Sequence, residues 1–146
     1  MTSDSRTNTE DIDTFLPEKD RITALLIDDD VEDSFLFSRL VARSKQIHFD
    51  IVTCRTVENA SELMRKARFD VVYIDYWLGM DTSIGFIHSE SHQAAPPLIL
   101  ITGLDTPDIR RCAYRAGAVG FLAKDALSVQ AIESVTLAVL NQDRNH

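Results

Sequence analysis

Polar, reactive side chains follow several of the apolar runs in this 146-residue sequence, at the point where each run ends. Asp75 closes the run VVYID, and Asp28 and Asp29 directly follow the run ITALLI. Thr102 follows LILI, and Lys124 comes two residues after the run VGFL. Carboxylates, a hydroxyl and an ammonium group can together hold a divalent cation and a phosphoryl group. Whether they meet depends on the elements that carry them.

The apolar runs are typical of buried strands, because they lack the alternation of a strand with one solvated face. Amphipathic stretches with helical spacing follow each run. The expected strands are residues 22–27, 48–53, 71–74, 98–101 and 119–122, and the expected helices are residues 31–43, 57–67, 84–91, 108–116 and 129–141. Crossovers of this length make the strands parallel and the connections right-handed. The sequence therefore predicts an α/β fold, with a five-stranded parallel sheet doubly wound by five helices.

In a parallel sheet the carboxyl ends of the strands meet at one edge, where open α/β folds bind ligands. We therefore expect Asp28, Asp29 and Asp75 to lie close together. Two carboxylates 4 Å apart repel each other by roughly 4 kcal/mol at an effective dielectric near 20. Lys124 supplies one compensating charge. Mg²⁺ is the expected cofactor, because it uses one or two carboxylates and keeps several waters.

A carboxylate beside Mg²⁺ and a lysine suits phosphoryl transfer, where catalysis is mostly positioning and charge neutralisation. Asp75 would be the nucleophile and form an aspartyl-phosphate. The Thr102 hydroxyl and the Lys124 ammonium would hold the phosphoryl oxygens. Taken singly, Thr102 is more simply explained as a strand-end hydroxyl and Lys124 as a solvated lysine. Their joint placement at the ends of neighbouring strands favours a phosphoryl-binding site.

Four motifs, LLIDDD, YIDYWLG, LILITG and GFLAKD, together resemble the receiver domains of two-component response regulators, of the single-domain chemotaxis type. The resemblance covers residues 21–142 and implies the flavodoxin-like strand order 2-1-3-4-5. It implies that Asp75 is the phosphoacceptor and that Asp28 and Asp29 position Mg²⁺.

The same resemblance implies roles for other positions. The backbone carbonyl of Trp77 matches the third protein ligand of the metal. Thr102 and Lys124 match the switch hydroxyl and the phosphate-binding lysine, and Phe121 matches the aromatic residue that changes rotamer on activation. The lifetime of the phosphorylated state depends in this family on the positions of Trp77 and Leu104. Bulky apolar side chains there predict slow autodephosphorylation, because they would exclude the in-line water.

Three residues depart from the family pattern. Gly79 stands where proline is common, and Gly85, which opens the third helix, comes about two residues late. Asp125 follows Lys124 in place of a frequent proline, and the family's usual cis peptide at this bond would cost about 3 kcal/mol without proline. These departures concern local geometry and leave the reactive side chains in place.

The predicted function is that of a stand-alone response regulator, which signals by phosphorylation-dependent protein binding and is not an enzyme. A histidine kinase or histidine phosphotransfer protein would phosphorylate it, docking on the first helix at Phe35, Leu36 and Arg39. A downstream target, or a second copy in a homodimer, would bind the face formed by the fourth helix, fifth strand and fifth helix. The last helix supports this, because Val129, Ile132, Val135, Thr136 and Val139 are more apolar than one buried stripe requires.

Composition sets the remaining expectations. Residues 1–20 are predicted to be a flexible acidic extension, 21–142 the receiver domain and 143–146 a short tail, with no output domain after it. The net charge of −8 disfavours nucleic acid, and the lack of a long apolar run or signal peptide predicts a cytoplasmic protein without membrane association. Cys54 and Cys112 are expected to be free thiols.

The four histidines, His48, His88, His92 and His146, are interpreted as surface or paired core groups, without the spacing of metal ligands.

Three other functions stay open from the sequence. One is an adaptor that keeps the fold without being phosphorylated. A haloacid-dehalogenase-like phosphatase shares the order Asp28-x-Asp30, Thr102 and Lys124, but Glu32 stands where that family expects Thr or Val, and no acidic strand end follows the lysine. A flavin-binding flavodoxin is disfavoured, because three aspartates would repel the flavin phosphate.

Overall fold

A computed structural model describes residues 20–144 of the chain. Five parallel strands form one sheet in the order β2-β1-β3-β6-β7. Their bounds are β1 Asp20–Ile27, β2 Ile47–Cys54, β3 Val71–Asp75, β6 Leu98–Thr102 and β7 Gly120–Ala123. The doubly wound order 2-1-3-4-5 is thus confirmed. Residues 1–19 of the predicted acidic extension and residues 145–146 of the predicted tail lie outside the described residues, so both remain predictions.

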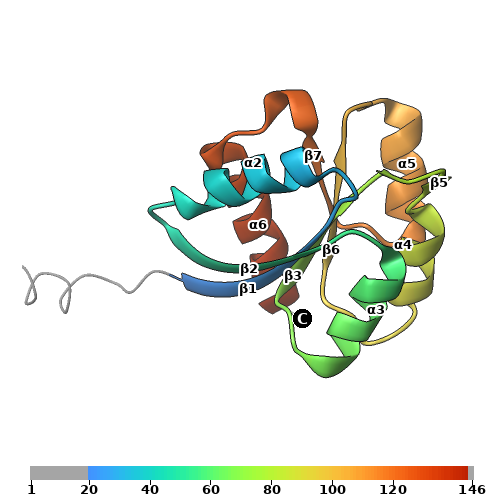
Figure 1. Ribbon diagram of the computed structural model, residues 1–146, viewed down its shortest axis with the longest axis horizontal. Coiled ribbons are helices and arrows are strands. Elements are labelled where there is room, and N and C mark those ends of the chain that lie inside the picture. Colours follow the sequence, from blue (N-terminus) through green and yellow to red (C-terminus); the bar gives the residue numbers. More distant parts are fainter. Residues whose placement is uncertain (1–19, 145–146) are drawn as a thin grey trace, which may run out of the picture.

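Five α-helices alternate with these strands and cover both faces of the sheet (Figure 1). Their bounds are α2 Val31–Ala42, α3 Val57–Lys66, α4 Ile84–Ser91, α5 Pro107–Ala116 and α6 Val129–Arg144. Four begin at side-chain caps, where hydrogen bonds from backbone N–H groups of the first turn are accepted by Asp30, Thr56, Thr106 and Ser128. These caps fix where each helix leaves the edge of the sheet.

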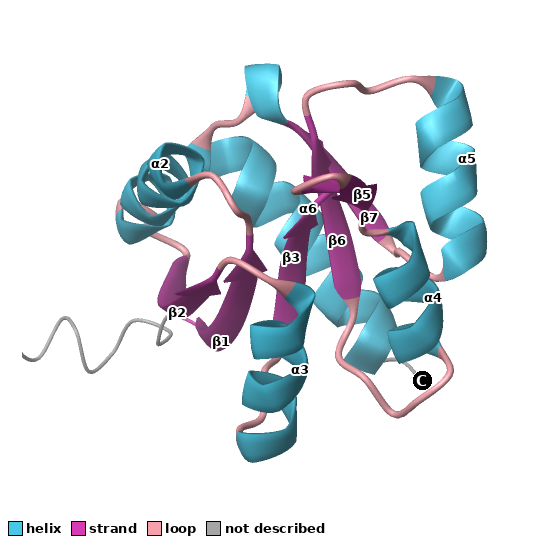
Figure 2. Ribbon diagram, turned by 45° about the vertical axis from the view of Figure 1, so that its right-hand side comes forward, coloured by secondary structure: helices cyan, strands magenta, loops and turns pink. Residues whose placement is uncertain are grey.

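Two apolar layers hold the helices on the sheet, with α2 and α6 on one face and α3, α4 and α5 on the other (Figure 2). Phe37 and Ile132 represent the first layer, and Ala60, Ile87 and Ala113 represent the second. Every residue of β3 and of β6 is buried. Burial on both faces explains why these central strands are uninterrupted apolar runs.

A small antiparallel hairpin stands where the sequence predicted a loop after β3. It consists of β4 Trp77–Leu78 and β5 Asp81–Thr82, with Gly79 in the turn at a φ of +67°. Two-residue strands are too short for a hydrophobic pattern to mark them. The positive φ favours glycine at this position, which accounts for the departure from proline.

The chain after β7 also differs in detail from the sequence-based expectation. A short 3₁₀ helix, η1 Lys124–Ala126, follows β7 at once, ahead of α6. No peptide bond between residues 20 and 144 is cis, so the bond after Lys124 is trans. Within the same range, no helix is long and apolar enough to span a membrane.

Candidate functional site

Three carboxylates meet at the carboxyl edge of the sheet, as the sequence predicted. Asp28 and Asp29 follow β1, and Asp75 ends the neighbouring strand β3, where Ile27 pairs with Ile74. One carboxylate oxygen from each lies within 4.8 Å of the others. Asp28 and Asp75 are buried and Asp29 is half-buried. The parallel pairing of β1 with β3 therefore creates the acidic cluster.

Backbone hydrogen bonds hold two of the carboxylates in place. Asp28 Oδ1 accepts a hydrogen bond from the backbone N–H of Asp30 at 2.9 Å. Asp29 Oδ2 accepts one from the backbone N–H of Gly79 at 2.8 Å. The second bond ties the turn of the β4–β5 hairpin to the acidic turn after β1. The hairpin thus forms one wall of the site.

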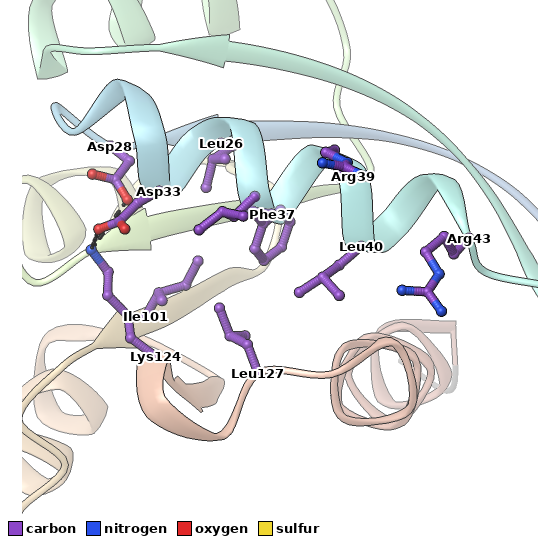
Figure 3. Close-up of a pocket in the computed structure, with 11 residues that line it drawn as sticks. Leu26, Asp28, Asp33, Phe37, Arg39, Leu40, Arg43, Ile101, Lys124 and Leu127 are labelled. Carbon is purple, nitrogen blue, oxygen red and sulfur yellow. Dashed lines mark hydrogen bonds and ion pairs between the residues drawn. The ribbon is translucent and has the colours of Figure 1, made fainter.

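Lys124 reaches into the acidic cluster from η1 and contacts three carboxylates, of which Figure 3 shows those of Asp28 and Asp33. Its Nζ lies 2.6 Å from Asp33 Oδ2, 3.1 Å from Asp75 Oδ2 and 3.3 Å from Asp28 Oδ2. The sequence analysis did not assign Asp33 to the site. Asp33 lies in the first turn of α2, one turn after the acidic turn, so its carboxylate faces the same crevice. The shortest contact of the lysine is therefore with a residue outside the predicted site.

Burial and mutual repulsion shift the pKa values of these groups. Burial, reinforced by the charge of Asp28, raises the pKa of Asp75 to about 6, although Lys124 partly offsets the shift. Burial also raises the pKa of Asp28. For Lys124, burial alone lowers the pKa, but the hydrogen bond to Asp33 and the charges of Asp75 and Asp28 outweigh it and raise the pKa. The lysine is therefore a fixed positive charge at neutral pH.

The three clustered carboxylates offer only oxygen ligands, and their spacing suits one small cation. Hard divalent cations prefer oxygen donors, and the repulsion among ionised carboxylates favours a bound positive charge. The donor set therefore fits a divalent metal ion.

Thr102 is buried at the end of β6, the strand that pairs with β3 on its other side. Its Oγ1 donates to the carbonyl of Leu104 and accepts from the N–H of the same residue, both at 3.0 Å. Among the described residues, no hydrogen bond joins Thr102 to Asp75 or Lys124. The hydroxyl is thus held by the following loop. The Leu104 side chain stays 58% exposed.

The side chains of Trp77 and Phe121 are both partly exposed and each contacts a neighbouring side chain. Trp77 is 49% exposed, and its ring meets Tyr76 edge to face with centroids 5.4 Å apart. Phe121 in β7 is half-buried, and the Arg110 guanidinium lies 5.2 Å from its ring centroid. Sequence reasoning missed Arg110, because a cation over an aromatic ring leaves no local pattern. In turn, Arg110 pairs with Asp105 through two hydrogen bonds of 2.5 and 2.8 Å.

The exposed face of α2 carries the residues predicted for docking. Phe35 is 60% exposed and Leu36 is 58% exposed, and the Arg39 guanidinium lies 5.7 Å from the Phe35 ring centroid. A cavity of about 340 Å³ opens between α2 and the segment that leads into α6 (Figure 3). Its walls include Leu36, Leu127 and Lys124. This partly apolar cavity is therefore continuous with the acidic site.

The last helix turns most of its apolar residues inward. Ile132, Thr136 and Val139 are buried, and Val129 and Val135 are half-buried. Thr136 also shares a hydrogen bond of 2.5 Å with the Tyr73 hydroxyl beneath the sheet. The apolar excess that suggested a partner site on this helix is therefore largely core packing. The exposed apolar side chains of this part of the surface are Tyr114 and Val119.

A family model described as the response regulator receiver domain matches residues 24–136 of the chain. No curated protein matches the chain. The family match covers all five strands at least in part and every residue of the acidic cluster.

Solved structures of response regulators share the fold. A response regulator protein from Burkholderia pseudomallei with a phosphorylated aspartic acid, calcium ion and citrate is 20% identical, with a TM-score of 0.70 over 88% of this chain and 72% of that chain. A putative response regulator from Chloroflexus aurantiacus is 19% identical, with a TM-score of 0.72 over 83% and 98% of the two chains. The beryllofluoride-activated NtrC4 receiver domain dimer is 24% identical, with a TM-score of 0.68 over 82% and 97%.

Proposed function

The chain belongs to the response regulator receiver domain family, a phosphoacceptor signalling module and not a conventional enzyme, and from that premise we propose that Asp75 accepts a phosphoryl group from a phosphohistidine donor. The observation that carries this proposal is the position of Asp75. Its carboxylate closes the central strand, lies within 4.8 Å of two other carboxylates and contacts Lys124 at 3.1 Å.

Mg²⁺ is the metal ion we propose for the acidic cluster. Asp28, Asp29, Asp75 and the backbone carbonyl of Trp77 would hold it. When bound, it would neutralise negative charge on the carboxylates and on the phosphoryl oxygens. Asp28 and Asp29 are already fixed by backbone N–H groups, so the ligand set is partly preorganised.

The transfer step makes one bond and breaks one. An oxygen of the Asp75 carboxylate attacks phosphorus in line with the bond to the donor, and that bond breaks as the donor keeps its electron pair. Lys124 would hold one phosphoryl oxygen, since its Nζ already lies beside Asp75. The Thr102 hydroxyl would hold another after leaving its hydrogen bonds to the Leu104 backbone.

A switch in β6 and β7 would report the modification. Drawing the Thr102 hydroxyl toward the phosphoryl group frees space that Phe121 would fill, a population shift between two packings. Phe121 is half-buried and covered by Arg110, so its movement would also disturb the Arg110–Asp105 pair. A downstream target would then distinguish the two packings.

The phosphodonor is proposed to be a histidine kinase or histidine phosphotransfer protein that docks on α2. Phe35, Leu36 and Arg39 present an exposed apolar and cationic surface beside the site. The cavity next to it would receive an apolar side chain of the donor. Burying the exposed parts of Phe35 and Leu36 would contribute to binding, at roughly 25 cal/mol for each Å² of apolar surface.

Phosphorylation by a small donor tests the proposal without the cognate kinase. Incubating the full chain with acetyl phosphate and Mg²⁺ should add the mass of one phosphoryl group, and Asp75→Asn should abolish the addition. Asp108→Asn, an exposed carboxylate on α5, is the matched control and should keep it. If wild type binds Mg²⁺ but gains no mass, the chain acts as an adaptor that is not phosphorylated, and the proposed phosphoacceptor function is wrong. Steady release of inorganic phosphate from many substrate molecules per chain would favour the phosphatase.

A further inference from the structure

Two histidines at the C-terminal end of α4 face each other on the surface of the molecule: His88 lies within the helix, and His92 directly follows its last residue. The Nε2 atoms of His88 and His92 lie 3.1 Å apart, and the two rings are nearly perpendicular, with centroids 4.5 Å apart. Both side chains are exposed. Both are surface groups, as the sequence indicated, and because residues four apart in a helix share one face, their two rings meet.

The distance between the two nitrogens suits a shared metal ion. Imidazole nitrogens bind Zn²⁺ at about 2.0–2.1 Å, and two such bonds to atoms 3.1 Å apart enclose an angle of about 95–102°. That angle lies between the ligand–metal–ligand angle of square or octahedral coordination and that of tetrahedral coordination. Only small side-chain rotations are therefore needed for either geometry. We propose that His88 and His92 chelate a transition-metal dication such as Zn²⁺, Ni²⁺ or Cu²⁺.

The present contact converts to chelation without a change in net protonation. The hydrogen bond requires one ring to carry its proton on Nε2 and the other to accept with its Nε2 lone pair. Binding the metal needs the lone pair of both Nε2 atoms, so the bonded proton moves to Nδ1 of the same ring. Among the described residues, neither histidine forms an ion pair, whereas His48 pairs with Asp50. No carboxylate therefore competes with the metal for these rings.

The helix holds the pair in place. Ser91, between the two histidines, donates to the carbonyl of His88 at 3.0 Å and approaches the carbonyl of Ala116 in α5 at 2.8 Å. The backbone under both rings is thus fixed against the neighbouring helix, which lowers the entropic cost of chelation. The open coordination positions face solvent and are available to water.

This site differs from the acidic cluster in place and in chemistry. α4 starts near the acidic edge of the sheet and runs toward the opposite edge (Figure 2), and His92 directly follows its last residue, Ser91. Imidazole suits Zn²⁺, Ni²⁺ and Cu²⁺, whereas carboxylates suit Mg²⁺. The inference does not depend on the proposed phosphorylation, because it uses none of the same residues.

Calorimetric titration of the full chain with ZnCl₂, NiCl₂ and CuCl₂ tests the proposal, with excess MgCl₂ present to occupy the acidic cluster. Wild type should bind one ion, and its affinity for Cu²⁺ should exceed its affinity for Ni²⁺ and for Zn²⁺. His88→Ala and His92→Ala should each weaken binding by about tenfold or more, equivalent to about 1.4 kcal/mol. Both variants should still accept phosphate from acetyl phosphate.

Two further histidines and the acidic cluster supply the controls. His48→Ala and His146→Ala should leave the affinity unchanged. Unchanged affinity in both His88→Ala and His92→Ala would overturn the proposal. So would loss of Zn²⁺ binding in Asp75→Asn with retention in His88→Ala, because the ion would then occupy the acidic cluster. Circular dichroism of each variant verifies that lost binding does not reflect unfolding.

Discussion

Asp75 is a carboxylate whose surroundings disfavour its charge while no cation is bound. Burial and the neighbouring Asp28 raise its pKa to about 6, above the ordinary value of 3.8. Between these two pH values the folded protein binds more protons than the unfolded chain, so the free energy of unfolding decreases as pH rises through this window. The ionised Asp75 carboxylate therefore destabilises the folded protein fully at neutral pH, and this destabilisation disappears below about pH 4.

Asp75→Asn removes the destabilising negative charge and should stabilise the metal-free protein at pH 7. A shift of about two pKa units corresponds to roughly 3 kcal/mol, and because the cluster borders solvent we expect about 1–2 kcal/mol. At pH 4 the gain should vanish. Urea denaturation in EDTA at both pH values measures it, with Asp108→Asn as the control. If Asp75→Asn raised the free energy of unfolding equally at both pH values, the raised pKa of Asp75 would not be the cause.

The half-exposed side chains of Trp77 and Leu104 should govern the lifetime of the phosphorylated state. Trp77→Asn and Leu104→Glu admit and orient water near the Asp75 phosphoryl group, so each should speed dephosphorylation several-fold. Trp77 is the only tryptophan of the chain, so its fluorescence follows phosphate loss in wild type and in the Leu104 variant. Intact mass over time serves for Trp77→Asn. Unchanged lifetimes in both variants would mean that water reaches phosphorus by another path.

At the scale of elements, α2 joins the acidic site to the proposed docking surface. Phe35→Asp places a charge on that surface and should strongly reduce phosphotransfer from a histidine donor, while phosphorylation by acetyl phosphate stays unchanged. Tyr114→Asp on α5 changes an equally exposed aromatic residue away from α2 and should keep both activities. Gel assays with a radiolabelled donor measure the transfer. If both variants behave alike, the donor docks elsewhere.

The close contact between α4 and α5 requires a residue without a side chain at Gly117. Gly117 ends α5 at a φ of +127°, and a Cβ there would clash with the Ser91 side chain, whose Oγ would lie at 2.7 Å. Gly117→Ala should therefore lower the free energy of unfolding by about 1–3 kcal/mol. Gly103→Ala, where a Cβ meets nothing within 4 Å and φ is not positive, should change it little. Denaturant titration compares the two variants.

The long elements could be predicted from the sequence, because their hydrophobic periods extend over several residues. The five strands, the five helices and the meeting of Asp28, Asp29 and Asp75 follow from that periodicity and from parallel pairing. The β4–β5 hairpin and η1 are too short to leave such a pattern. Contacts across the fold, such as Asp33 with Lys124 and Arg110 over Phe121, depend on side-chain direction and are not marked by local spacing.

At the scale of the whole molecule, activation could change the state of association. The similar NtrC4 receiver domain was solved as a beryllofluoride-activated dimer. For this chain we expect sedimentation velocity to show a larger species in Mg²⁺ and beryllofluoride than in Mg²⁺ alone. The face of α5, β7 and α6 stays the predicted contact, through exposed Tyr114 and not through the inward-facing residues of α6. Equal sedimentation under both conditions would exclude the dimer and leave a separate target protein.

Every reactive side chain of the acidic site lies at one edge of the sheet, and the turns at the other edge carry none of them. The strand β1 starts at that second edge and α6 returns to it (Figure 1). In the connection between α4 and β6, residues 92–94 are exposed and residues 95–97 are half-buried. A reporter domain inserted into this connection, or a circular permutation that opens the chain there, should leave the acidic site intact, which makes the fold a practical scaffold for a phosphorylation biosensor.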